Sequence, residues 1–198
     1  MTDAVPTIDP HRTALLVMDY QVALLDPMEG ADELLDGVAE AIADVRRAGG
    51  HVGYVRVAFT DEDLAAIPAT SRMAAAVATR GTALHAEAAT SVIHDRVAPE
   101  PGDIVVRKVR VGAFSTTDLA AQLDALGIDT LLLAGIATSG VVLSTLRDAS
   151  DRDYRVYVVA DACADPDPEV HEFLIGRVFP RQAHVVTLSD LPGLLGLT

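Results

Sequence analysis

The stretch that decides the fold runs from Asp129 to Ala149 and reads DTLLLAGIATSGVVLSTLRDA. Residues 130–134 form an apolar run without polar alternation, the pattern of a strand buried on both faces of a sheet. Gly135 follows, and Thr138 and Ser139 are candidate N-caps for the helix indicated by the apolar spacing that comes next. A strand, a tight turn and a helix start together place backbone N–H groups at the carboxyl edge of a sheet, where open α/β folds bind ligands.

Outward from this stretch, apolar runs alternate with helical patterns. The apolar runs predict strands at 13–19, 51–57, 102–108, 130–134, 154–160 and 183–187. Helical spacing and caps predict helices at 31–48, at 115–126 with Ser115 as N-cap, from 138 onward, at 168–178 and at the C-terminal end, with shorter ones at 61–66 and 73–78. This alternation predicts right-handed crossovers and a parallel sheet covered on both faces. The segment 58–101 is the least legible and could cover a sheet edge, form a lid or build a subunit interface.

The composition limits the classes of function. With 198 residues, of which 50% are apolar and 22% charged, the chain fits one domain, 1–198. A formal net charge of -14 disfavours nucleic acid and anionic membranes as partners, because both would repel the protein. The first residues lack the pattern of a secretion signal and no apolar stretch reaches spanning length, so we expect a cytoplasmic protein.

Two charged residues close predicted strands. Asp19 ends the run 13–19, where a carboxylate either caps a loop or lies among catalytic groups, and its position alone leaves both open. Lys108 is the only lysine among the 15 lysines and arginines. Because lysine is a compact charge whose pKa burial can move, whereas arginine stays charged, its use here points to a task that arginine cannot perform.

The remaining reactive side chains give weaker signals. Cys163 is the single cysteine and is predicted to be a small buried apolar residue, because the acidic residues around it would raise its pKa. The six histidines form no HxH or HExxH pattern, so we expect no metal, and nothing indicates another cofactor. Ser139 and Ser144 are possible nucleophiles, but no GxSxG elbow is present.

Three segments together resemble the isochorismatase-like hydrolase superfamily: LLVMDYQ around Asp19, GDIVVRKVRVGAFSTTDL around Lys108, and AGIATSGVVLSTLRDASDRDYRVYVVADACAD. They occur in the family's order and spacing and span nearly the whole chain. The resemblance implies a three-layer α/β/α sandwich, Rossmann-like, with a parallel six-stranded sheet in the order 3-2-1-4-5-6. It also implies a cis peptide at Ile136–Ala137 and a homo-oligomer, dimer or tetramer.

The resemblance also implies catalytic roles. Cysteine-hydrolase members use an aspartate, a lysine and a nucleophilic cysteine, which correspond to Asp19, Lys108 and the position of Gly140, where this sequence has no side chain. Isochorismatases proper cleave a vinyl ether without that cysteine, and there Asp19 would act as a general acid and Lys108 would orient an anionic or carbonyl group. The implied set for binding a small-molecule substrate or an oxyanion comprises Ala137, Ser139, Gly140, Gln21 and Phe114.

Three readings of the function stay open. The first is a hydrolase of a small anionic metabolite that uses Asp19 and Lys108 without a covalent intermediate. The second is a catalytically inactive relative that keeps the pocket for binding or assembly. The third is an amide hydrolase with Ser139 or Cys163 as a substitute nucleophile.

The pair of Asp19 and Lys108 raises two physical questions. A positive Lys108 lowers the pKa of Asp19 and opposes an acid role, whereas burial raises it. In the implied strand order, Lys108 leaves a strand two places from that of Asp19, roughly 10 Å away at about 4.8 Å per strand. The lysine side chain or a curling loop must therefore close that distance.

Overall fold

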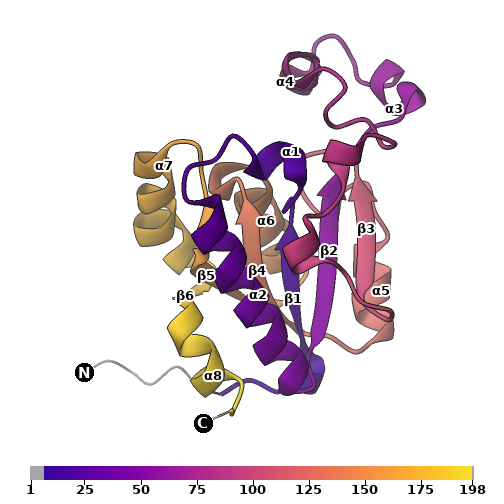
Figure 1. Ribbon diagram of the computed structural model, residues 1–198. Coiled ribbons are helices and arrows are strands. Elements are labelled where there is room, and N and C mark those ends of the chain that lie inside the picture. The colour runs from indigo at the N-terminus through magenta and orange to yellow at the C-terminus, as the bar shows by residue number, and fades with distance from the viewer. Residues whose placement is uncertain (1–6, 198) are drawn as a thin grey trace.

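A six-stranded parallel sheet lies between two layers of helices in the computed structural model, which describes residues 7–197 (Figure 1). The strands are β1 (Thr13–Met18), β2 (His51–Val57), β3 (Ile104–Lys108), β4 (Thr130–Ile136), β5 (Arg155–Ala164) and β6 (His184–Val186). Their order is β3-β2-β1-β4-β5-β6, and every neighbouring pair is parallel. This order confirms the fold class that the resemblance implied.

The helices are α1 (Val22–Leu25), α2 (Ala31–Arg47), α3 (Asp61–Ala65), α4 (Arg72–Arg80), α5 (Leu119–Ala125), α6 (Leu143–Asp151), α7 (Pro168–Phe173) and α8 (Leu191–Leu194). Two π-helical segments, Thr138–Val142 and Leu174–Val178, precede α6 and follow α7. Single 3-10 turns occur at Pro10–Arg12, Ala89–Ser91, Asp95–Val97, Phe179–Arg181 and Leu188–Asp190. No helix among residues 7–197 is long and apolar enough to cross a membrane.

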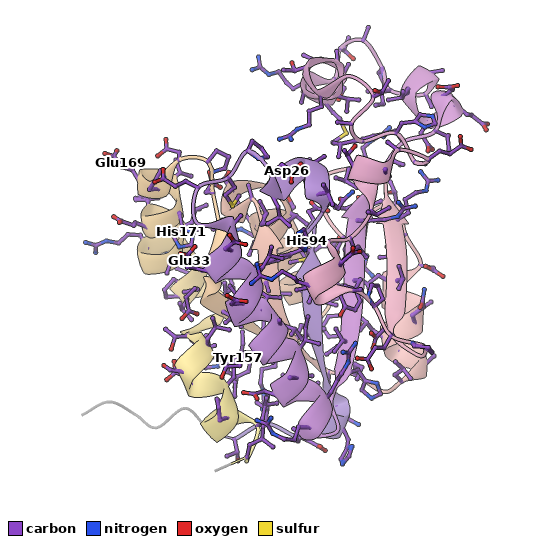
Figure 2. The ribbon with its side chains drawn as sticks, viewed as in Figure 1. Asp26, Glu33, His94, Tyr157, Glu169 and His171 are labelled. Carbon is purple, nitrogen blue, oxygen red and sulfur yellow. The ribbon has the colours of Figure 1, made fainter. Side chains whose placement is uncertain are left out.

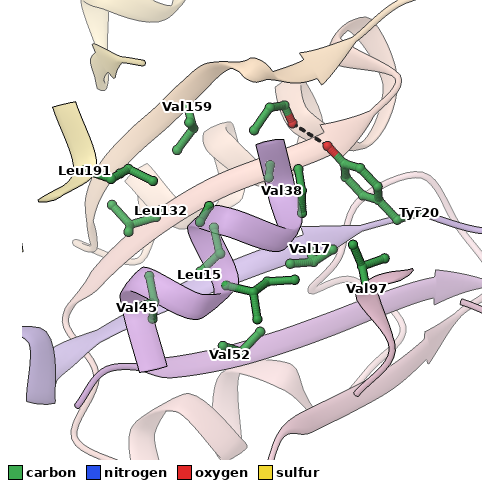
Figure 3. Packing of buried hydrophobic residues seen from close by; sticks show 14 of the residues in the cluster. Leu15, Val17, Tyr20, Val38, Val45, Val52, Val97, Leu132, Val159 and Leu191 are labelled. Atoms are coloured by element: carbon green, nitrogen blue, oxygen red, sulfur yellow. Dashed lines mark hydrogen bonds between the residues drawn. The ribbon is translucent and has the colours of Figure 1, made fainter. Parts of the chain in front are cut away.

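The core is divided by the sheet into two apolar clusters. On one face, Val38 and Val45 of α2 pack against Leu15, Leu132 and other strand residues (Figure 3). On the other face, α5, α6 and the segment Leu174–Val178 cover the sheet. All residues of β1 and β4 are buried, which explains why their sequences carry no polar alternation.

Two predicted helices differ from the structure. The helix predicted from Ser115 begins only at Leu119, and Ser115 is exposed and caps nothing. The chain before α5 is instead a loop, in which the Thr117 hydroxyl donates to the Ala113 carbonyl and accepts from the Leu119 N–H. The helix predicted over 168–178 is α-helical only to Phe173 and then widens into a π-helical turn.

The segment 58–101 holds two helices that stand apart from the sheet. Helices α3 and α4 project beyond the carboxyl ends of β2 and β3 (Figure 1), and neither has a buried residue. The base of this projection is fastened to the body, because the Phe59 N–H donates to the Leu84 carbonyl at 2.9 Å and the Ala86 N–H donates to the Phe59 carbonyl at 2.8 Å. We call residues 58–86 the arm.

The central strand offers a test of this packing. Leu132→Ala removes a fully buried side chain from the middle of the sheet and should lower the free energy of unfolding in urea by about 2–5 kcal/mol. Leu126→Ala removes the same atoms from a residue that is 43% exposed and should change it by less than about 1 kcal/mol. Equal losses in the two variants would contradict the assigned core.

Candidate functional site

Asp19 lies at the carboxyl end of β1 in an unusual backbone conformation. Its φ is +64°, in the left-handed region that aspartate tolerates better than most residues. The Asp19 N–H donates to the Val55 carbonyl at 2.7 Å, which ties this turn to β2. The residue is only 4% exposed, and its Oδ1 atom is buried without a hydrogen-bond partner among the residues that the structure describes.

Lys108, the last residue of β3, meets this carboxylate. Its Nζ lies 2.8 Å from Asp19 Oδ2, and both side chains are almost completely buried. The ammonium also donates to the Val111 carbonyl at 2.8 Å and to the Arg110 carbonyl at 3.3 Å. The structure thus brings together the two residues that the sequence singled out, because the lysine side chain spans the intervening strand β2 and the loop after β3 curls back over its end.

Burial dominates the ionisation of Asp19. Removal from water raises the pKa of this carboxyl from its usual value of 3.8 to about 6, although the charge and hydrogen bond of Lys108, the nearby backbone N–H of Val57 and, last, the charge of Arg80 lower it. Burial and Lys108 therefore act on the pKa of Asp19 in opposite directions, and the effect of burial is the larger. A carboxyl with a pKa near 6 can both give and take a proton close to neutral pH.

The turn after β4 supplies a second part of the site. A cis peptide joins Ile136 to Ala137, as the resemblance implied. The Gly140 and Val142 N–H groups donate back to the Ala137 carbonyl at 3.1 and 3.3 Å. The Ser139 N–H donates to Asp165 Oδ2 at 2.7 Å. These three N–H groups are therefore engaged within the chain, and the carboxylate held by the turn is that of Asp165.

Helix α7 holds this turn from the side. The prediction that Thr138 or Ser139 caps a helix is wrong, because neither side chain makes a capping hydrogen bond. The Thr138 hydroxyl is instead fully buried and lies 2.8 Å from Nδ1 of His171, which α7 presents (Figure 2). Sequence reasoning missed His171 and Asp165; a helix starting at Pro168 was expected, but no local pattern indicates what its side chains contact.

Gln21 has a structural task beside the site. It is completely buried, and its Nε2 donates to the carbonyls of Val57 at 2.9 Å and Ser91 at 2.6 Å. Its Oε1 accepts from the Val57 N–H at 2.8 Å. Since both amide hydrogens are used, the side chain joins the end of β2 to the start of α1 and has no hydrogen left for a ligand.

Phe114 lies away from Asp19 and Lys108. Its ring stacks on Tyr154, with centroids 6.0 Å apart, and the Arg152 guanidinium lies 5.0 Å from its centroid. Both partners come just before β5, at the amino-terminal edge of the sheet and thus opposite to the edge where Asp19 lies. The structure does not bring Phe114 to the other candidate residues.

The single cysteine is poorly suited to nucleophilic attack. Cys163 is 5% exposed on β5, and its thiol donates to the Leu133 carbonyl at 3.7 Å. Burial raises its pKa to about 12, so that the thiolate is scarce at neutral pH. Within residues 7–197, no three His, Cys, Asp or Glu side chains are arranged to hold a metal ion.

Comparison with known proteins gives a consistent result. A sequence model described as the isochorismatase domain matches residues 13–190. The chain is 34% identical over 188 residues to the phenazine biosynthesis protein PhzD of Pseudomonas fluorescens, covering 93% of this chain and 86% of the relative. It is 32% identical over 182 residues to the ureidoacrylate amidohydrolase RutB of Methylobacterium radiotolerans, covering 82% and 70%. A solved isochorismatase-family structure from Burkholderia thailandensis has a TM-score of 0.83 at 27% identity and covers 97% of this chain and 99% of that one.

Two glycines of the turn region should respond differently to an added methyl group. A Cβ at Gly140 would meet only the Ala137 Cβ, at 3.8 Å, so Gly140→Ala should leave the free energy of unfolding within about 0.5 kcal/mol of the parent. A Cβ at Gly135 would lie 2.9 Å from Val142 Cγ2 and 3.3 Å from the Met18 Cβ, so Gly135→Ala should lower it by about 1–3 kcal/mol. Urea denaturation measures both, and a larger loss in Gly140→Ala would refute the assigned geometry of the turn.

Proposed function

The chain belongs to the isochorismatase family, and from that premise we propose that it hydrolyses a small anionic metabolite by proton transfer from Asp19, without a covalent bond to the protein. One observation carries the proposal: Oδ2 of Asp19 is held by Lys108, whereas its buried Oδ1 has no hydrogen-bond partner in the described chain. An unpaired buried oxygen on a carboxyl with a pKa near 6 is suited to deliver a proton.

The reaction that this acid serves best is the hydrolysis of a vinyl ether. The carboxylic acid form of Asp19 gives its proton to the terminal vinyl carbon, forming a C–H bond and leaving an oxocarbenium ion. Water adds to the cationic carbon, and the proton that this water loses returns to the Asp19 carboxylate. The resulting hemiketal breaks its C–O bond to give a ketone and an alcohol, so one water molecule is consumed and the protein is regenerated.

The hydrogen bonds of the turn favour a cationic rather than an anionic transition state. Hydrolysis of an amide passes through an oxyanion, which needs free N–H donors. Here the N–H groups of Ser139, Gly140 and Val142 already have acceptors within the chain. An oxocarbenium ion needs no such donors and is stabilised by nearby carboxylates. This supports vinyl-ether hydrolysis over the amide hydrolysis for which RutB is named.

A covalent route has little chemical support in this chain. The turn from 136 to 142 contains no cysteine, and the only thiol is the buried Cys163 with its raised pKa. Ser139 is exposed and has no basic side chain hydrogen-bonded to it among the described residues. Without an activated nucleophile, an acyl-enzyme intermediate does not form at a useful rate.

The pH dependence of the reaction tests the acid role. Because only the protonated form of Asp19 donates, kcat/KM for a vinyl-ether carboxylate such as 2-methoxyacrylate should fall as the pH rises above about 6. Asp19→Asn should reduce kcat/KM at least about 100-fold. Lys108→Met removes a charge that lowers the pKa of Asp19, so the descending limb should move to higher pH.

Cys163→Ala is the control and should keep both the rate and the pH profile of the parent. Full activity in Asp19→Asn, or a rate that rises with pH through 6, would overturn the acid role. Ligand-dependent thermal stabilisation without turnover of vinyl ethers, amides or esters would instead favour a binding function.

We also propose that the chain assembles with a second copy of itself through the β3 side of the sheet. The burial of β3 alternates: Val105 is 48% exposed and Arg107 is exposed, whereas Ile104, Val106 and Lys108 are buried. One face of this edge strand therefore lacks the helical cover that α2 gives to β1. An apolar residue on an open edge strand is a typical site for association.

Sedimentation equilibrium tests this assembly. The parent should be a dimer or tetramer, and Val105→Glu should shift it to the monomer, because the new charge would be buried in the contact. Leu126→Glu places the same charge on a residue of similar exposure, 43%, directly after α5, and should leave the mass unchanged. A monomeric parent would refute the proposal.

A further inference from the structure

An anionic substrate needs a cationic or N–H partner, and the most obvious donors of the site are already in use. The three ammonium hydrogens of Lys108 face Asp19 and the carbonyls of Val111 and Arg110. Three N–H groups of the turn after β4 are paired within the chain: those of Gly140 and Val142 with the Ala137 carbonyl, and that of Ser139 with the Asp165 carboxylate. A substrate carboxylate must therefore be met by another group, and in a protein with a net charge of -14 it will not be drawn in without one.

Arg80 is the cation placed to do this. It is the last residue of α4, it is exposed, and its guanidinium makes no ion pair or hydrogen bond within the described residues. Two other arginines of the chain are occupied by carboxylates: Arg107 pairs with Asp63, and Arg96 pairs with Asp32. A guanidinium offers two parallel N–H donors that match a carboxylate.

The arm holds Arg80 beyond the carboxyl edge of the sheet, where Asp19 and Lys108 lie. The Ala58 N–H donates to the Lys108 carbonyl at 3.3 Å, so the arm begins beside the catalytic lysine. Four residues after Arg80, the chain returns to the same place, where Leu84 accepts from the Phe59 N–H. Helix α4 lies beyond the carboxyl ends of β2 and β3 (Figure 1). The charge of Arg80 also acts on the buried carboxyl, where it lowers the pKa of Asp19.

We propose that Arg80 is the specificity-determining residue of this site and binds a carboxylate of the substrate, so that the scissile bond lies between the arm and Asp19. The substrate class is then a small carboxylic acid whose carboxylate is close to the bond that breaks. The inference rests on the proposed function for the position of the reaction, but it concerns binding and can be measured without turnover. A bound carboxylate neutralises Arg80 and thereby favours the protonated form of Asp19, so binding prepares the acid.

The test compares two arginines at opposite ends of α4, Arg80→Gln and Arg72→Gln. Both residues are exposed and both substitutions remove one positive charge. The probes are 2-methoxyacrylate and its methyl ester, titrated by NMR against proteins that also carry Asp19→Asn and so do not turn over the probe. Arg80→Gln should weaken binding of the acid about 10- to 100-fold and leave the ester unchanged, whereas Arg72→Gln should change neither. Arg80→Lys should recover part of the loss.

A second readout needs no ligand. In proteins that keep Asp19, the carboxyl pKa followed by ¹³C NMR should rise in Arg80→Gln and stay constant in Arg72→Gln. Acid and ester binding equally to the parent, or equal effects of the two arginine substitutions, would overturn the inference. Arg80-dependent binding of the acid with no hydrolysis by the parent would overturn the proposed function and leave this inference intact.

Discussion

The structure depends on the removal of one ion pair from water. Asp19 and Lys108 are both nearly fully buried and lie 2.8 Å apart. Taking two charges out of water costs several kcal/mol for each, and their attraction repays this only when the geometry is good. Part of this cost is avoided because burial raises the pKa of the Asp19 carboxyl to about 6, so that it binds its proton more tightly. The burial that makes the pair costly is thus also the property on which the proposed acid role of Asp19 depends.

The surroundings of the pair are built to keep it in place. The loop after β3 gives two carbonyls to the ammonium, and the hydrogen bonds of the Thr117 hydroxyl keep the chain that follows in a loop until α5 begins. The amide nitrogen and oxygen of Gln21 both form hydrogen bonds with backbone atoms of Val57 and Ser91. These bonds fix the turn that carries Asp19. A buried charge pair requires this rigidity, because any opening that admitted water would return the pKa of Asp19 toward its ordinary range.

The parts of this arrangement that follow from local chemistry could be predicted. Uninterrupted apolar runs indicate β1 and β4, and the use of a single lysine, at a strand end, singles out Lys108. Contacts between distant segments could not be predicted in this way. Nothing near Thr138 indicates that its hydroxyl meets His171 rather than capping a helix, and nothing near Arg80 indicates that its charge reaches Asp19. Such contacts arise only when the chain is folded, whereas a sequence pattern indicates only the spacing of residues within one helix or strand.

The hydrogen bonds within the fold determine which sign of charge the site can stabilise on a reacting molecule. The turn after β4 uses the N–H groups of Gly140 and Val142 on its own carbonyl and that of Ser139 on Asp165, so these three donors are not available to a developing negative charge. In the proposed reaction, Asp19 adds a negative charge beside the reacting carbon once it has lost its proton. Such a site penalises an oxyanion and favours an oxocarbenium ion. In the proposed reaction the substrate's own carboxylate then needs a partner outside the buried pair, and a cation on the projecting arm meets that requirement without adding positive charge where the oxocarbenium ion forms.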